Sequence, residues 1–296
     1  MGIFNGAGGR ELGDLLRVHR VAAGLSLKQL GARVGRSPAH LHRLEVGERA
    51  VTTETEVVHY LASCGAPFQD VQRLVRFCRE MDDTRGYWLP THGRWMGDSL
   101  RSLIFHESSA VSSVNYEPEL VPGLLQTEAY ARARFLCHAD QADDVEPGVK
   151  ARTERQRILF RRTPAKFTFL VQERALRLIV GDHQLMTEQM LAMLFLADQP
   201  NIKIRVVPGT EAFGGSFHYF GFERRNPSLV YLDNHVGGLF LQDKGLVESY
   251  VTVLRSVAKV AMNAEESRML IADLAGDYDR VSDCLNDSGQ VAQEQL

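Results

Sequence analysis

Residues 24–49 constrain the fold of this chain more than any other stretch. They hold two short amphipathic segments, Leu27–Val34 and Pro38–Leu44, separated by a tight Gly-Arg-Ser turn. A serine stands directly before each segment, where its hydroxyl can accept a hydrogen bond from the free amides of a helix start. Proline at the first position of the second segment suits a helix start, which does not need the missing N–H. The stretch therefore predicts two short helices joined by a tight turn.

The spacing inside this stretch also predicts how the two helices pack. Gly35 supplies the positive φ that the turn requires, and Gly31 is small where the helices approach each other. Glu45 is expected to tie the unit together by pairing with a neighbouring arginine or a backbone amide. The apolar positions expected to face the partner helix are Leu27, Leu30, Val34, Leu41 and Leu44. Helices packed in this way cross steeply, so the second helix is expected to protrude and to fit a DNA major groove.

The outward face of the second helix holds the candidate contacts to DNA. Arg43 suits a bidentate contact to guanine, and His42 suits a base or a phosphate. The basic side chains outside this helix suit phosphates, which add affinity but carry no sequence information. The predicted DNA-binding residues are Arg17, Lys28, Arg36, Ser37, Pro38, Ala39, His40, His42, Arg43 and Arg49. Two alternatives stay open, a plain helical hairpin and a helix-turn-helix that now contacts protein instead of DNA.

The charge distribution favours the DNA-binding interpretation, although the net charge of −3 does not. Residues 10–49 contain eight Lys or Arg and four Asp or Glu, which gives +4 and leaves −7 for the rest of the chain. A small basic module on an acidic body suits phosphate contact at one end only.

Composition indicates a globular protein of two domains. The chain has 296 residues, of which 44% are hydrophobic and 24% charged, and no apolar stretch is long enough for a membrane helix. No secretory signal is visible, and no membrane partner is expected. Cys64, Cys78, Cys137 and Cys284 lie far apart and form no CxxC pair, which suits a reducing cytoplasm and predicts neither disulfides nor a metal site.

Residues Leu12–Leu61 resemble the Xre-type, phage-repressor-like DNA-binding domain. The resemblance implies five helices and an all-α N-terminal domain. Two positions depart from the family pattern: Leu27 stands where the family usually has Gln, and Pro38 where it often has a polar residue. The residues that carry the resemblance are Ala23, Gly24, Leu25, Ser26, Leu30, Gly35, Ser37, Leu41, Arg43, Leu44, Glu45, Gly47, Glu48 and Arg49.

The remaining sequence predicts a mixed domain, so the overall class is α+β. The expected organisation is a disordered N-terminus at 1–9, the DNA-binding domain at 10–81, a junction at 82–99, a regulatory and dimerisation domain at 100–281, and a polar tail at 282–296. Alternation and β-branched content predict a small sheet. Its expected strands are 110–118, 166–172, 202–207, 217–223 and 229–233.

Residues 115–130, NYEPELVPGLLQTEAY, resemble the signature of a C-terminal domain that follows Xre-type modules in actinomycete regulators. That domain is described generically as of unknown function or as antitoxin-like. On the residues alone, Pro-Gly makes a turn out of a strand and Thr127 caps the next helix, so that the motif defines the fold. The alternative is a pocket for a ligand or a partner peptide. Its candidate residues are Tyr116, Glu117, Gln126, Tyr130, Arg155, Gln156 and Glu173.

The sequence shows no known catalytic, cofactor or metal-binding motif, so we expect a protein that is not an enzyme and has no cofactor. The predicted function is a dimeric, sequence-specific transcriptional regulator of double-stranded DNA, whose C-terminal domain senses a small molecule or a small partner protein. The alternative is an antitoxin-like interaction module with autoregulatory DNA binding. An apolar face on the helix predicted at 245–262 suits either core packing or a homodimer seam.

Overall fold

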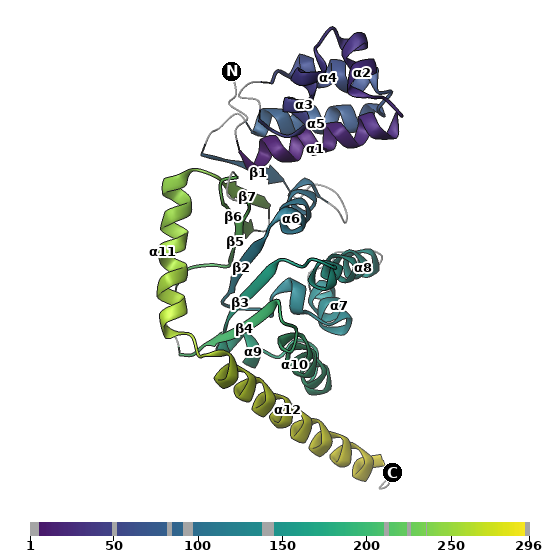
Figure 1. The fold of residues 1–296 in the computed structure, drawn as a ribbon. Coiled ribbons are helices and arrows are strands. Elements are labelled where there is room, and N and C mark those ends of the chain that lie inside the picture. Colours follow the sequence, from purple (N-terminus) through teal and green to yellow (C-terminus); the bar gives the residue numbers. More distant parts are fainter. Residues whose placement is uncertain are drawn as a thin grey trace. The chain divides into compact units, whose positions relative to one another are not determined.

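The computed structural model describes residues 6–48, 52–81, 85–90, 97–137, 145–209, 213–223, 226–234 and 236–293 (Figure 1). The chain divides into two compact units, and neither is continuous in sequence. The first unit comprises residues 1–93, 97–110 and 220–250, and the second comprises 94–96, 111–219 and 251–296. The class is α+β as predicted, with a helical N-terminal region followed by a mixed region.

Five helices form the N-terminal part of the first unit. They are α1 (Ala7–Ala22), α2 (Leu27–Val34), α3 (Pro38–Glu45), α4 (Glu54–Ser63) and α5 (Phe68–Glu80). The sequence predicts disorder at 1–9, of which residues 1–5 lie outside the described part of the chain. Helix α1 begins at Ala7, whose backbone amide donates to Gln242 Oε1 at 3.0 Å. Ala7, Gly8 and Gly9 are buried, which explains why a glycine-rich start is ordered here.

The first unit also contains an antiparallel part of the sheet and one further helix. It holds β1 (Gly86–Pro90), β6 (Leu229–Asn234), β7 (Gly237–Leu241) and α6 (Asp98–Ser109). Strand β1 lies inside the predicted junction at 82–99, where no strand was expected. It pairs antiparallel with β7, and Tyr87 lies opposite Phe240 with the two rings stacked at 4.8 Å. This part of the junction is therefore a strand and not a free linker.

A buried polar cluster joins α1 to β1 and α6 within the first unit. The Ser102 hydroxyl donates to Glu11 Oε1 at 2.5 Å, and the Tyr87 hydroxyl lies 3.3 Å from Glu11 Oε2 and 2.7 Å from His106 Nε2. All four residues are at most 4% exposed. Burial lowers the pKa of His106 and raises that of Tyr87 well above its ordinary value. Through these contacts α1 shares a buried core with β1 and α6.

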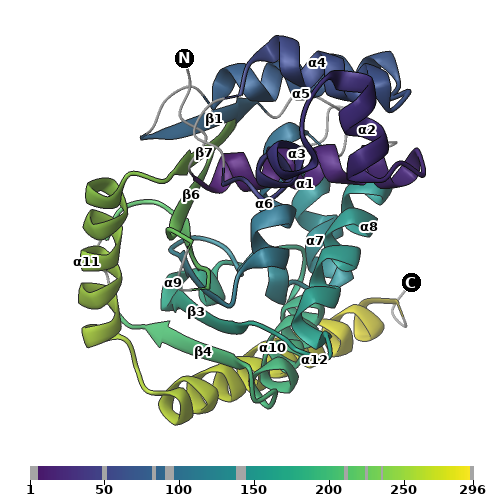
Figure 2. The same ribbon diagram turned by 45° about the horizontal axis from the view of Figure 1, so that its top comes forward.

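The second unit is built on three parallel strands, β2 (Ser112–Glu117), β3 (Lys166–Gln172) and β4 (Ile202–Val207). Its helices are α7 (Glu128–Leu136), α8 (Val145–Gln156), α9 (Glu173–Arg177), α10 (His183–Ala197) and α12 (Ala264–Gln293), with short 3₁₀ turns η1 (Gly123–Leu125) and η3 (Arg157–Phe160). Helix α10 lies beside α12 in both views (Figures 1 and 2). Methionines 186, 190 and 193 of α10 are fully buried against the apolar side chains of β3 and β4.

The seven strands are ordered β1-β7-β6-β5-β2-β3-β4, and the division between the two units falls within β5 (Phe217–Gly221). All five predicted strands are present, and β1 and β7 were not predicted. Helix α11 (Lys244–Val260) passes from the first unit into the second. Leu254 and Val257 of its apolar face are buried, whereas Leu246 is exposed, so both interpretations of this face stay open.

Helix α12 extends to Gln293, so it includes most of the predicted polar tail at 282–296. The last three residues of that tail lie outside the described part of the chain. Tyr278 holds the middle of α12 in the second unit, because it is buried and its hydroxyl donates to the backbone oxygen of Leu176 at 2.8 Å. None of the described helices is long and apolar enough to cross a membrane.

Candidate nucleic-acid interface

The turn between α2 and α3 has the predicted geometry. Ser26 caps α2 and forms a reciprocal capping box with Gln29, whose backbone amide donates to the serine hydroxyl at 3.2 Å. Gly35 ends α2 at φ +68°, a left-handed conformation that favours glycine. A Cβ on Gly31 would lie 2.5 Å from the carbonyl oxygen of Arg36, so only glycine allows this close approach. Ser37 then caps α3 by accepting from the amide of His40 at 3.2 Å.

A buried ion pair holds the inner face of α3 against α1. Glu45 at the end of α3 accepts two hydrogen bonds from Arg20 of α1, at 2.6 and 2.8 Å, and one from the Tyr60 hydroxyl of α4 at 2.5 Å. The Glu45 side chain is 2% exposed and that of Arg20 is 13% exposed. The prediction that Glu45 ties the unit to a neighbouring arginine is confirmed. Burial and the Glu45 carboxylate raise the pKa of Tyr60. Helix α3 is thus bound to α1 and α4 through one carboxylate.

The opposite face of α3 is open. Most of the predicted DNA-binding residues are exposed, and among the described residues only His40 is half-buried. The exposed ones are Arg17, Lys28, Arg36, Ser37, Pro38, Ala39, His42 and Arg43. Arg17 lies 3.9 Å from Asp14 on α1, whereas Arg36, His42 and Arg43 lie on α3 or directly before it. Arg49 lies outside the described residues. The exposed face of α3 and its preceding turn therefore carries three basic or ionisable side chains.

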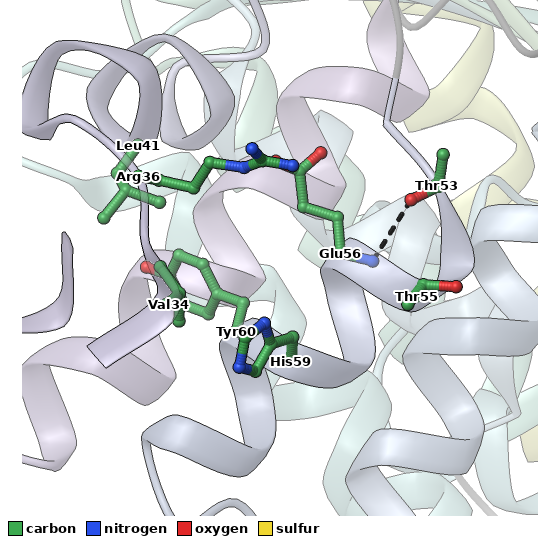
Figure 3. Close-up of a pocket in the computed structure, with 8 residues that line it drawn as sticks. All are labelled: Val34, Arg36, Leu41, Thr53, Thr55, Glu56, His59 and Tyr60. Atoms are coloured by element: carbon green, nitrogen blue, oxygen red, sulfur yellow. Dashed lines mark hydrogen bonds and ion pairs between the residues drawn. The ribbon is translucent and has the colours of Figure 1, made fainter. Parts of the chain in front are cut away.

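A small pocket lies between the α2–α3 turn and the start of α4 (Figure 3). Its volume is about 120 Å³, and its lining includes Arg36, Leu41, Glu56 and Tyr60. Figure 3 shows the Arg36 side chain extended toward Glu56. Glu56 Oε1 lies 3.4 Å from Arg36 Nε and 2.5 Å from His40 Nε2. His40 is therefore directed at α4, and the base-reading candidates on α3 itself are His42 and Arg43.

Two neighbouring residues of the predicted C-terminal pocket, Tyr116 and Glu117, do not face the same way. Successive residues of a strand point to opposite faces, so Tyr116 and Glu117 separate. On one side, Glu117 lies near Asn115 and His218, at 3.3 and 3.9 Å. On the other, the Tyr116 hydroxyl accepts from Gln172 at 3.0 Å. The structure thus places Tyr116 and Glu117 on opposite faces of the sheet, whereas Arg155 and Arg152, the partner of Gln126, act on His218 on the side of Glu117.

The PGLLQT segment, residues 122–127, is held in the second unit by side-chain hydrogen bonds. The side chain of Gln126 donates to the backbone oxygen of Val121 at 2.8 Å and accepts from Arg152 of α8 at 3.0 Å. The side chain of Gln156 donates to the backbone oxygen of Gln126. The Tyr130 hydroxyl accepts from the amide of Val121 at 3.3 Å. Gln126 and Gln156 thus hold the turn against α8, and Tyr130 connects it to α7.

The two remaining candidates, Arg155 and Glu173, lie in charged surroundings. Arg155 is buried at 8% exposure, and with Arg152 it disfavours the protonated form of His218. Burial is the larger cause, and together these effects lower the pKa of His218 to about 3. Glu173 pairs with Arg177 one turn further along α9, at 2.7 Å. No group of side chains suited to a metal ion occurs among the residues that the structure describes.

Comparison with known families assigns both parts of the chain. Residues 11–86 match a helix-turn-helix domain family. Residues 100–273, more than half of the chain, match the family described as a domain of unknown function, DUF5753. The chain belongs to the DUF5753 family. The DUF5753 match begins inside α6, so Ser102 and His106 lie in it while Glu11 lies in the helix-turn-helix match. The buried cluster of the first unit therefore joins residues of both matched regions.

Other comparisons add little to this assignment. The structure of TrmBL2, an archaeal chromatin protein described as showing a novel mode of DNA binding, matches with 10% identity over 85% of this chain and 93% of that one. Its TM-score of 0.30 is too low to carry an argument. No curated protein matches the chain.

Sequence reasoning missed two residues that shape the interface. Gln29 completes a capping box whose Ser-x-x-Gln spacing is visible in the sequence, so the signal was available. Glu56 carried no such signal, because its two partners lie sixteen and twenty positions earlier in the chain and meet it only after α4 folds back on α3.

Proposed function

We propose that this chain is a sequence-specific DNA-binding transcriptional regulator of the Xre type, and that α3 is its recognition helix. The observation that carries the proposal is the contrast between the two faces of α3. The inner face is bound to α1 and α4 through the buried Glu45, whereas the outer face presents His42 and Arg43 to solvent. A rigid helix with a basic outer face suits insertion into a major groove. The proposal gives the chain a binding role and no catalytic one.

We further propose that the regulator acts as a homodimer and that the DUF5753 part responds to a small molecule or a small partner protein. One recognition helix contacts few base pairs, and two half-sites about 34–36 Å apart multiply the sequence discrimination. The cluster around Glu11 gives a route for such a response, because it links α1 directly to α6 of the DUF5753 match. A DNA-binding role also fits the cytoplasmic location expected from the cysteines.

The proposal is tested by measuring DNA binding over a range of salt concentrations. Fluorescence anisotropy with a labelled duplex from the region upstream of the gene should show affinity that falls as salt rises, since phosphate contacts release counterions. Replacing Arg43 with alanine should weaken binding to a preferred sequence by about 1–3 kcal/mol. The matched control is Arg76→Ala, which removes the same charge from an exposed position on α5. Equal losses in both variants would contradict the assignment of α3.

A further inference from the structure

Glu56 is an acidic side chain placed inside the surface that we assign to DNA. It lies in the first turn of α4, after the cap residue Thr53, and its side chain is 11% exposed. It lines the pocket beside the α2–α3 turn together with Arg36 (Figure 3). A carboxylate at this place repels the phosphates of any DNA that approaches α3. Its position therefore calls for a role other than DNA attraction.

One oxygen of Glu56 contacts two of the predicted DNA-binding residues. Glu56 Oε1 accepts a hydrogen bond from His40 Nε2 at 2.5 Å and lies 3.4 Å from Arg36 Nε. Arg36 remains 52% exposed, so a phosphate can reach it in competition with Glu56. His40 is only 16% exposed and is held against α4. The carboxylate thus fixes the first turn of α3 and offsets the charge of the arginine that precedes it.

The neighbouring Glu54 shows that an acidic residue in this turn need not have such a role. Glu54 forms two hydrogen bonds to Arg79 of α5, at 2.8 and 2.7 Å, and both side chains are exposed. Its partner Arg79 belongs to α5 and not to the α2–α3 turn. The two glutamates therefore share a helix turn and a charge but differ in what they contact.

We propose that Glu56 is a residue of the DNA interface that lowers its affinity for the phosphate backbone by holding Arg36. This inference rests on the proposed function. Binding to arbitrary sequences depends mainly on phosphate contacts, so a carboxylate that competes for Arg36 weakens that mode of binding. Binding to a preferred sequence uses the same phosphate contacts and gains further from base contacts of Arg43, which Glu56 does not touch. Glu56 therefore lowers both affinities by about the same factor, and their ratio, which sets specificity, is left to the base contacts.

The test compares Glu56→Gln with the matched control Glu54→Gln on two probes. One probe is a duplex of random sequence, and the other is a duplex enriched by the full-length protein from a random library. Glu56→Gln should bind the random duplex about five-fold more tightly, the effect of one exposed ion pair. Its salt dependence should steepen by about one counterion. The enriched duplex should gain by about the same factor, so that the ratio of the two affinities is unchanged. Glu54→Gln should change neither affinity nor slope.

Two further measurements separate an effect on phosphate affinity from a purely structural role. Replacing Arg36 with alanine in the Glu56→Gln variant should return the affinity for the random duplex to about the wild-type level. The melting temperature of Glu56→Gln should match that of Glu54→Gln. If Glu56→Gln instead leaves the random duplex unchanged, or weakens both probes equally, the proposal is overturned while the proposed function stands. If the wild-type protein binds neither probe, the proposed function itself fails.

Discussion

Replacing Glu45 with alanine should loosen α3 more than any other single change in the helix-turn-helix. The side chain accepts three hydrogen bonds, two from Arg20 and one from Tyr60, and it is almost fully buried. Removing one partner of a buried ion pair costs about 3–5 kcal/mol, because the other charge is left without its counterpart. Arg20 keeps a hydrogen bond to the backbone oxygen of Leu25 at 2.7 Å and is 13% exposed, which places the expected cost near the lower end, at about 3 kcal/mol.

Hydrogen exchange of the full-length protein measures this loss where it occurs. The amides of α3 exchange through local opening, so a loss of about 3 kcal/mol should speed their exchange by about 150-fold. Amides of the second unit should keep their wild-type rates and serve as the internal control. Tyr60→Phe removes only one of the three hydrogen bonds and should cost about 1.5–3 kcal/mol.

A paired substitution distinguishes loss of the ion pair from loss of packing. In Arg20→Met combined with Glu45→Leu, no buried charge is left unpaired, so the double variant should be more stable than Glu45→Ala alone. An increase in α3 exchange of less than about five-fold in Glu45→Ala, which corresponds to about 1 kcal/mol, would refute the claim that this carboxylate anchors the recognition helix.

Three further predictions concern other parts of the structure. Gly31→Ala should weaken DNA binding and lower the melting temperature, because the added Cβ would meet a backbone oxygen at 2.5 Å; unchanged values would show that the turn shifts freely. His218 stays neutral in the fold with a pKa of about 3, whereas in the unfolded chain it takes up a proton near pH 6.5. Stability of the second unit should therefore be complete above about pH 6.5 and fall on acidification by up to about 1.4 kcal/mol per pH unit. His218→Asn should flatten that slope in urea titrations at several pH values, and an unaltered slope would contradict the assignment. Glu11→Leu should destabilise α1 and α6 together by about 1–3 kcal/mol, because the Ser102 hydroxyl loses its acceptor. Faster hydrogen exchange in α1 alone would show that the cluster does not couple the two helices.

The helix-turn-helix was predictable because its signals are local. Serine caps, a left-handed glycine and apolar spacing all act within a few residues of the turn, and each has the predicted role in the structure. The strands β1 and β7 were missed because their order comes from pairing between distant segments, with Tyr87 opposite Phe240. Neither GYWLP nor GGLFL alternates clearly enough to indicate a strand by itself.

In the candidate site of the DUF5753 part, the sequence could predict the placement of some side chains but not of others. The strand at 110–118 was predicted, and alternation along it already implies that Tyr116 and Glu117 face opposite sides. The information needed to separate them was therefore present in the sequence. By contrast, the partners of Gln126 on α8 and the charged surroundings of His218 depend on how distant helices and strands pack, which no local pattern encodes.

Affinity selection from a random DNA library tests the central claim most directly. The full-length protein should enrich one motif, and that enrichment should disappear in Arg43→Ala while the Arg76→Ala control keeps it. A dimer would give two copies of the motif about one helical turn apart, or a multiple of that spacing. Absence of any enriched sequence from the wild-type protein, or an identical motif from Arg43→Ala, would contradict the assignment of α3 as a sequence-reading helix.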